Sequence, residues 1–169
     1  SLIISAFTKI KNVKKSITPQ LIDSNELLLV YLDLSKTKKR LGGSILSEVT
    51  QQTNLETPNL ECIDEFPKIY NYLATKIDKK KIFSFHDISD GGLIVSAVEM
   101  MLAGGCGLNL DLSKISFLKE SSNLFSEELG MIFQINKKDF SEFKKDFVKL
   151  GLKNSFFNIG STNNTNNLF

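Results

Sequence analysis

The segment KIFSFHDISDGGLIVSAVEMMLAGGCGLNLDL, residues 81–112, carries the clearest structural pattern in this chain. It begins with an apolar run that predicts a strand, and the turn that follows leads into a helix from Asp90 to about Ala103. Only Ser96 and Glu99 interrupt the apolar surface of that helix, so we expect it to be buried on most sides. Glycines end the helix, and residues 104–112 alternate apolar and polar side chains as a strand does.

Similar patterns on either side of this segment predict further strands and helices. Strands are expected at residues 2–7, 27–33 and 155–160, and at the end of NLFSEELGMIFQIN (123–136), after a short turn of helix. Helices are expected at residues 42–53, 62–77 and 137–150. Their inward faces are expected to carry Ile45, Leu46 and Val49, then Phe66, Ile69, Tyr70, Leu73 and Ile77, then Phe140, Phe143, Phe147 and Leu150. The elements alternate without the regular repeat of a doubly wound fold, so we predict an α/β (α+β) domain, a layered mixed sheet with helices packed on it.

Length and composition limit the function classes. The 169 residues fit one domain, 1–169, in which about 1–20 lead in from a preceding domain and about 161–169 form a frayed tail or a weak last strand. The opening lacks a methionine, so we expect the chain to be part of a longer protein. A net charge of +2, with 24% charged and 41% hydrophobic residues, describes an ordinary globular chain and not a polycationic nucleic-acid binder.

Cysteine usage and hydropathy give expectations about the compartment. Cys62 and Cys106 lack the spacing of a disulfide framework or a zinc site, so we predict a reducing, cytoplasmic setting. No apolar run approaches the roughly 18 to 20 residues of a membrane span, so no membrane partner is expected.

The turn HDISDGG, residues 86–92, is the first candidate site. A helix start offers free N–H groups and partial positive charge, and Gly91 and Gly92 let a phosphate approach the backbone. Asp87 is a candidate Mg²⁺ ligand, and Ser89 a candidate donor to a phosphate or a ribose. Alternatively, Ser89 or Asp90 caps the helix and the glycines allow tight packing. His86 also has two interpretations: it is a general base, or it is a hydrogen-bonded structural residue.

Two further motifs are candidates. In SKTKKRLGGSIL, residues 35–46, an anion could meet Arg40, Gly42, Gly43 and Ser44 at a helix start; a solvated basic loop with a helix cap is the alternative. In SEELG, residues 126–130, Glu127 and Glu128 could face a metal or an amine, or could simply be solvated.

Six motifs in order resemble one known family. They are SLIISAF, ITPQL, RLGGSIL, HDISDGGL, AVEMMLAGGCGLNLDL and LFSEELGMIFQI, and they span about Leu2 to about Gly160. Together they resemble the second carboxy-terminal AIR-synthase-like domain of large, single-chain phosphoribosylformylglycinamidine synthases. One motif alone would also suit aminoimidazole ribonucleotide synthases or selenophosphate synthetases.

The resemblance implies a role in de novo purine biosynthesis. Enzymes of that family use ATP and glutamine to convert formylglycinamide ribonucleotide to formylglycinamidine ribonucleotide. By motif, Asp87 matches a Mg²⁺ ligand and Ser89 a nucleotide contact of an auxiliary ATP/ADP site between domains, and no catalytic residue is implied. The glutaminase and the amino-terminal AIR-synthase-like domains would be the partners, on the same polypeptide. The 169 residues alone are therefore expected to be inactive.

Three alternatives stay open at this point. The chain could belong to another ATP-dependent enzyme of the AIR synthase superfamily, or be a non-enzymatic nucleotide-binding module. It could also bind nucleic acid weakly through Lys36, Lys38, Lys39, Arg40 and the 79–81 lysines, but no aromatic platform accompanies these cations. We therefore expect no nucleic-acid partner.

Overall fold

A computed structural model describes residues 4–10, 12–113, 115–118 and 120–169. One five-stranded sheet has the order β2-β4-β1-β5-β3. The strands are β1 (Leu27–Asp33), β2 (Ile82–Asp87), β3 (Gly107–Leu110), β4 (Gly130–Asn136) and β5 (Phe156–Asn163). The α-helices are α1 (Ile45–Val49), α2 (Phe66–Asp78), α3 (Gly92–Gly104) and α4 (Phe140–Lys149). Short 3-10 helices are η1 (Val13–Lys15), η2 (Ser116–Leu118), η3 (Ser121–Phe125) and η4 (Lys137–Asp139).

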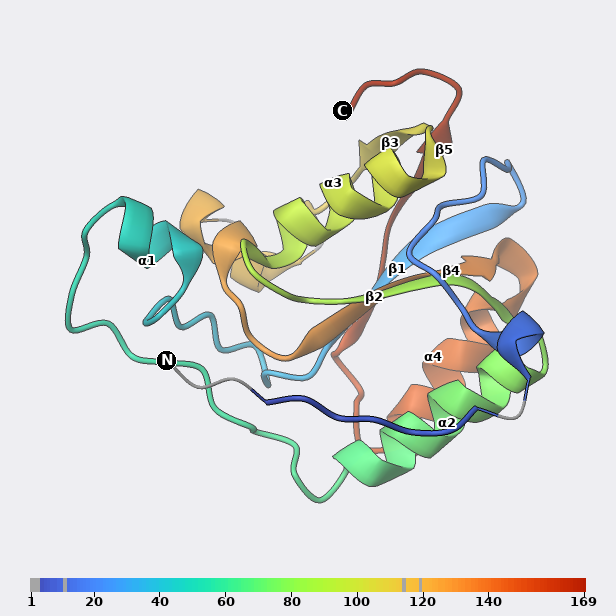
Figure 1. Ribbon diagram of the computed structural model, residues 1–169, viewed down its shortest axis with the longest axis horizontal. Coiled ribbons are helices and arrows are strands. Elements are labelled where there is room, and N and C mark those ends of the chain that lie inside the picture. Colours follow the sequence, from blue (N-terminus) through green and yellow to red (C-terminus); the bar gives the residue numbers. More distant parts are fainter. Residues whose placement is uncertain (1–3, 11, 114, 119) are drawn as a thin grey trace.

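Two of the three inner strands of the sheet, β1 and β4, are formed by apolar runs. In β1 all but one residue is buried, and in β4 all but the last. Such runs suit positions covered on both faces, where no polar face is needed. Figure 1 shows how this is achieved, with α3 on one side of the sheet and α2 and α4 on the other.

Aromatic side chains build the core beneath α2 and α4. Phe143 and Phe147 point from α4 into a cluster with Phe133 of β4 and Phe156 of β5, and the Phe147 and Phe156 ring centroids are 4.8 Å apart. On the opposite face, Leu93, Ala97 and Met100 of α3 pack in a second cluster. The sheet therefore separates two cores, as expected for a layered domain.

The predicted fold class is confirmed, and the sheet itself is more regular than expected. All four strand pairings are antiparallel, whereas a mixed sheet was predicted. Among the described residues, a single parallel bridge joins Leu108 to Leu168 in the tail. The tail is not frayed there, because the Leu108 N–H donates to the Asn167 carbonyl and the Phe169 N–H to the Leu108 carbonyl. The alternative of a weak last strand is the better description.

Several predicted faces and boundaries are wrong. The described part of the first predicted strand, residues 4–7, is not a strand, and both Ile4 and Phe7 are exposed; residues 2–3 lie outside the described residues. Helix α1 is shorter than predicted and ends at Val49, which is exposed together with Ile45. Its buried residue is Ser47, whose N–H and hydroxyl donate to the hydroxyl and the carbonyl of Ser44.

Burial also departs from the pattern on α2 and α3. Tyr70 of α2 is exposed, although the spacing placed it inward. Helix α3 starts at Gly92, and Leu102 near its end is exposed while Ser96 is buried. An apolar helix therefore covers the sheet with only one face. Strand β3 is shorter than the predicted 104–112, and β5 longer than 155–160. Among the described residues, no helix combines the length and the apolar character needed to cross a membrane.

The aromatic core gives a direct test of the packing. Phe133→Ala should lower the free energy of unfolding by about 3 to 5 kcal/mol, because the side chain is fully buried and its removal leaves a cavity. Phe7→Ala is the matched control and should change it by less than about 0.5 kcal/mol, since this ring is exposed. Urea unfolding followed by circular dichroism measures both, and Phe133→Leu, at about 1 kcal/mol, serves if the alanine variant does not fold. Equal losses for the two phenylalanines would contradict this packing.

Candidate functional site

Three turns that are far apart in sequence meet at one end of the sheet. They are residues 40–44 before α1, residues 86–92 between β2 and α3, and residues 126–129 before β4. The Ser126 hydroxyl donates to the Arg40 carbonyl over 3.0 Å, which fixes the third turn against the first. The three motifs that the sequence presents separately therefore form one site.

Glu127 joins the starts of two helices. Its Oε1 accepts from the Ile45 N–H at 2.9 Å and from the Gly91 N–H at 2.8 Å. These N–H groups stand at the first residue of α1 and the N-cap of α3, where no intrahelical carbonyl is available and negative charge is favoured. The carboxylate of Glu127 thus occupies the type of position in which a phosphate was expected.

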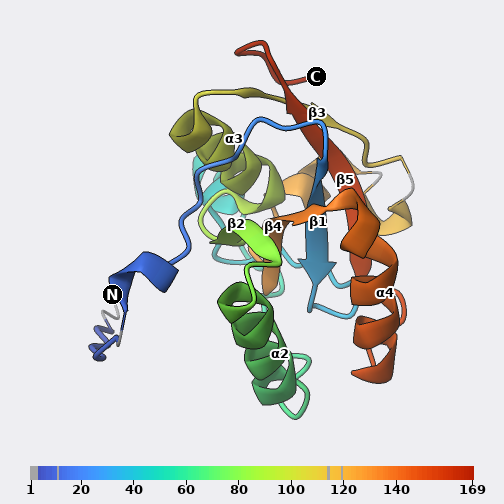
Figure 2. The same ribbon diagram turned by 90° about the vertical axis from the view of Figure 1, so that its right-hand side faces the viewer.

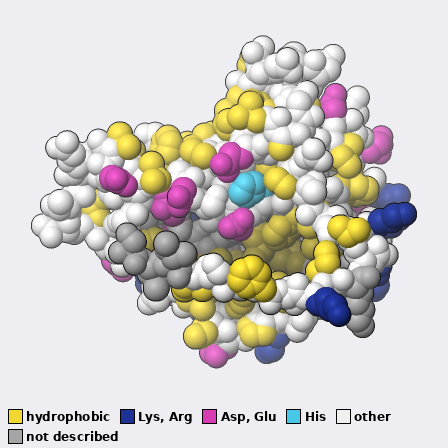
Figure 3. Space-filling model, viewed as in Figure 1, with side chains coloured by type: hydrophobic (Ala, Val, Ile, Leu, Met, Phe, Trp, Pro, Cys, Tyr) yellow, Lys and Arg dark blue, Asp and Glu magenta, His cyan; other side chains and the backbone are white. Residues whose placement is uncertain are grey.

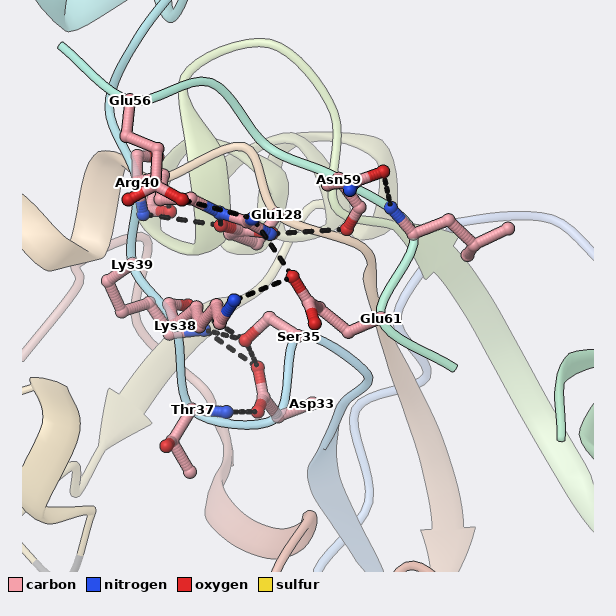
Figure 4. A network of polar contacts seen from close by, with 12 residues as sticks. Asp33, Ser35, Thr37, Lys38, Lys39, Arg40, Glu56, Asn59, Glu61 and Glu128 are labelled. Atoms are coloured by element: carbon pink, nitrogen blue, oxygen red, sulfur yellow. Dashed lines mark hydrogen bonds and ion pairs between the residues drawn. The ribbon is translucent and has the colours of Figure 1, made fainter. Parts of the chain in front are cut away.

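Glu128 makes a buried ion pair with Arg40 (Figure 4). The pair is bidentate: Nε lies 2.5 Å from Oε1 and Nη2 lies 2.8 Å from Oε2. Glu128 is 1% exposed, so its charge has little contact with water. The hydrogen bonds that Arg40 donates to Glu128 raise the pKa of Arg40 above its ordinary value. The interpretation of Glu127 and Glu128 as simply solvated is therefore wrong.

Glu61 extends this pair into a network. Its Oε1 lies 2.9 Å from Arg40 Nη1 and 3.0 Å from Lys38 Nζ. The hydrogen bond from Lys38, aided by the charge of Arg40, lowers the pKa of Glu61. Arg40 Nη2 also donates to the Asn59 carbonyl. Each of the three guanidinium nitrogens of Arg40 thus has an acceptor within the protein.

Most of the residues at 40–44 that were predicted to contact a phosphate interact with other parts of the protein instead. Ser44 is buried and caps α1, accepting from the Ser47 N–H and donating to the Leu41 carbonyl. A Cβ on Gly42 would lie 2.3 Å from the Leu55 carbonyl oxygen, so this glycine allows close chain packing. Gly43 alone opens onto free space. The geometry of Arg40, Gly42 and Ser44 favours the cap interpretation, and phosphate contact by these residues stays a prediction.

Asp87 and His86 lie on an open face. The Asp87 side chain is 72% exposed, and within the described part of the chain its carboxylate contacts only His86, whose Nδ1 lies 3.4 Å from Oδ1. His86 Nε2 lies 3.2 Å from Glu99 Oε2, so the imidazole sits between two carboxylates. Figure 3 shows this histidine, the only one in the chain, among acidic side chains beside a hollow lined by hydrophobic ones. His86 is thus hydrogen-bonded, as the structural interpretation expects.

Ser89 does not cap α3. Its N–H donates to Ser96 Oγ and its carbonyl accepts from the Gly92 N–H, while the N-cap residue Gly91 has no side-chain cap bond of its own. The predicted cap by Ser89 or Asp90 is therefore wrong, because Glu127 supplies the acceptor from another turn. Within the described residues the Ser89 hydroxyl has no hydrogen-bond partner and is available to a ligand.

Gly92 is required by packing. Its φ is +71°, and a Cβ there would lie 2.6 Å from the Phe125 carbonyl carbon. The start of α3 can therefore lie directly on η3. Tight packing, one of the two predicted roles of the glycines, is confirmed at this position.

The donor set fits a metal only in part. Among the residues that the structure describes, no group of three or more His, Cys, Asp or Glu side chains could hold a metal ion. Mg²⁺ is commonly bound through one or two carboxylates, with phosphates and waters completing an octahedron. Asp87 can thus be one ligand of such an ion, and the others must come from outside these residues.

A hollow of about 410 Å³ adjoins two of the three turns, residues 86–92 and 126–129. It is lined by Pro58, Asn59, Leu60, Ile88, Glu127 and Leu129. Ile88 follows Asp87, and Glu127 accepts from N–H groups at the starts of α1 and α3, so the hollow places free space next to both candidate motifs.

Two glycine variants separate backbone strain from packing. Gly43→Ala should cost about 1 to 2 kcal/mol, because φ is +78° but the space around a Cβ is open. Gly92→Ala should cost at least about 1 kcal/mol more, since the same strain is joined by a clash with Phe125. Thermal unfolding compares the two variants. Equal costs would show that η3 does not lie against the start of α3.

Comparison with known proteins agrees with this architecture. A model of the AIR synthase related protein C-terminal domain matches residues 25–169. A probable phosphoribosylformylglycinamidine synthase of Arabidopsis thaliana, chloroplastic/mitochondrial by name, is 38% identical over 138 residues, or 81% of this chain and 10% of that protein. The chain thus spans about a tenth of the length of this curated relative.

Solved structures show the same fold at low sequence identity. PurL of T. maritima complexed with ATP has a TM-score of 0.65 at 11% identity, over 90% of this chain and 24% of that one. HypE of E. coli, a hydrogenase maturation protein, has a TM-score of 0.57 at 16% identity, over 87% of this chain and 46% of that one. With the matched domain covering most of the sequence, the chain belongs to the AIR synthase related protein family, as a C-terminal domain of that family.

Proposed function

We propose that this chain is a domain of a phosphoribosylformylglycinamidine synthase. Such an enzyme is a carbon–nitrogen ligase of purine biosynthesis that uses ATP, with glutamine as amido donor. The observation that carries the proposal is the 38% identity to a probable enzyme of this kind over 81% of the chain. The six ordered sequence motifs resemble the same family.

Within the enzyme, the domain would contribute to a Mg²⁺–nucleotide site at a cleft between domains. Asp87 would be a metal ligand and Ser89 a nucleotide contact. Two properties support this assignment: the Asp87 carboxylate is exposed, and the Ser89 hydroxyl is unused by the described residues. PurL proteins of the same fold were solved with ATP and with ADP.

Glu127 limits where the phosphates can lie. The Gly91 N–H already has a carboxylate acceptor, so a phosphate can use that donor only by displacing Glu127. We therefore place the phosphates beside Asp87 and Ser89, with Gly91 and Gly92 shaping the turn. This arrangement keeps a negative side chain out of direct competition with the nucleotide.

Other domains of the same polypeptide would complete the site. One carboxylate and one hydroxyl cannot hold a Mg²⁺–nucleotide alone. The relative is about ten times longer than the part that this chain matches, which leaves room for the glutaminase and the amino-terminal AIR-synthase-like domains. No catalytic residue is assigned to the chain. The cytoplasmic location stays a prediction, while the name of the Arabidopsis relative refers to chloroplasts and mitochondria.

The test is Asp87→Asn in the full-length enzyme. The substitution keeps the shape of the side chain but removes the charge that offsets the metal, so nucleotide affinity should fall about tenfold or more, and thermal stability with it. Asp90→Asn, in the same exposed turn, is the matched control and should change neither. Nucleotide content per chain and melting temperature are measured for each.

The same substitution in the 169-residue chain should be silent. That chain should also release no ADP when supplied with ATP, formylglycinamide ribonucleotide and an ammonia source. Unchanged nucleotide content in full-length Asp87→Asn would remove Asp87 from the site. Turnover by the 169-residue chain would show that the chemistry lies within it.

A further inference from the structure

The start of β5 has a strand on only one of its sides. Strand β1 pairs with it there, with Tyr31 opposite Phe157 and Leu32 opposite Phe156. On the other side β3 reaches only Gly160–Asn163. Among the described residues, no strand covers the outer edge of 156–158.

The hydrogen-bond pattern gives the direction of the backbone groups at this edge. The Asp33 N–H donates to the Ser155 carbonyl over 2.7 Å, so residues 155 and 157 bond toward β1. Alternation along the strand then turns the N–H and C=O of Phe156 and Asn158 outward. The last bond on the outer side is from the Asp111 N–H to the Ile159 carbonyl. The outward N–H and C=O groups of Phe156 and Asn158 are therefore placed where an added strand could pair with them.

A cavity of about 700 Å³ lies along this edge. Its lining comes mainly from β5, from α4, from the loop that joins them and from the loop after β3, and β5 and α4 lie on the same side of the molecule in Figure 2. Phe117 and Phe140 belong to the lining and are held by other rings. The Phe117 ring lies edge-on to Phe157 with centroids 5.6 Å apart, and Phe140 stacks on Phe156 at 5.2 Å. The cavity therefore offers fixed aromatic surfaces on both sides of the open backbone.

The charge of the cavity is positive. Lys144 and Lys153 line it, and neither has an ion-pair partner within the described part of the chain. Asp111 is the one carboxylate in the lining, and its Oδ1 accepts from the N–H and the hydroxyl of Ser113. Two cations without carboxylate partners face the space next to an unpaired strand edge.

We propose that this edge binds an extended acidic peptide, which adds a strand to β5. Main-chain bonds to Phe156 and Asn158 would supply affinity, and alternate side chains of the peptide would lie against the aromatic walls. The two lysines select carboxylates at the remaining peptide positions. Lysines beside a strand edge can also act only to prevent unwanted pairing, and this is the competing interpretation.

The probe is the peptide EVEFEVE-amide with fluorescein on its amino terminus, titrated with the 169-residue chain and followed by fluorescence anisotropy. A second peptide carries N-methyl groups at alternate backbone nitrogens and keeps the same charge. The N-methyl peptide should bind at least about tenfold more weakly, because it loses the donors that pair with the edge. Equal binding of the two peptides would overturn strand addition, and no binding of either would leave the lysines as edge protection.

Charge reversal locates the site on the protein. Lys144→Glu combined with Lys153→Glu should weaken binding about tenfold or more, since both cations line the cavity. Lys138→Glu combined with Lys145→Glu is the matched control at exposed positions outside the lining and should change affinity less than about twofold. Circular dichroism melting confirms that each variant is folded. Equal weakening by the two pairs would show nonspecific attraction and overturn the site.

Discussion

The burial of Glu128 is the constraint on which the candidate site depends. A carboxylate that is 1% exposed must have a cationic partner, because an unpaired buried charge is costly. Arg40 is that partner, 88 residues away in sequence, and their bidentate contact brings the turn before α1 against the turn before β4. Glu127, the next residue along the chain, is thereby held between the starts of α1 and α3.

This arrangement divides the candidate residues into two groups. Arg40, Ser44 and Glu127 have partners inside the protein and position the turns. Asp87 and Ser89 lie on the open face with side-chain oxygens that a ligand can reach. A binding site on a turn requires both kinds of residue. The inner residues fix the backbone of the turn, and only then can the outer side chains hold a defined position toward a ligand.

Local patterns predicted most of the elements but not how they meet. The apolar runs of β1 and β4 and the phenylalanine spacing of α4 were sufficient to predict these elements. The period of apolar residues along a segment depends on whether that segment is a strand or a helix. The exposure of Val49 and Leu102 was not predictable in this way, because burial depends on what else covers a face. The hydrogen bonds that Glu127 accepts from the starts of α1 and α3 were not predicted, because two adjacent glutamates in a sequence carry no information about distant N–H groups. One signal did exist: Arg40 is the only arginine among 21 basic residues, and a planar guanidinium suits a bidentate carboxylate.

The central claim is that the Arg40–Glu128 pair holds Glu127 across the two helix starts. Amide hydrogen exchange of Ile45 and Gly91, measured in wild type and in Glu128→Gln, tests it directly, with Ile132 in the middle of β4 as the reference for global stability. The account predicts that protection of Ile45 and Gly91 falls together, by about tenfold or more relative to Ile132, because both amides share one acceptor. Unchanged protection of the two amides, or loss at only one of them, would contradict it.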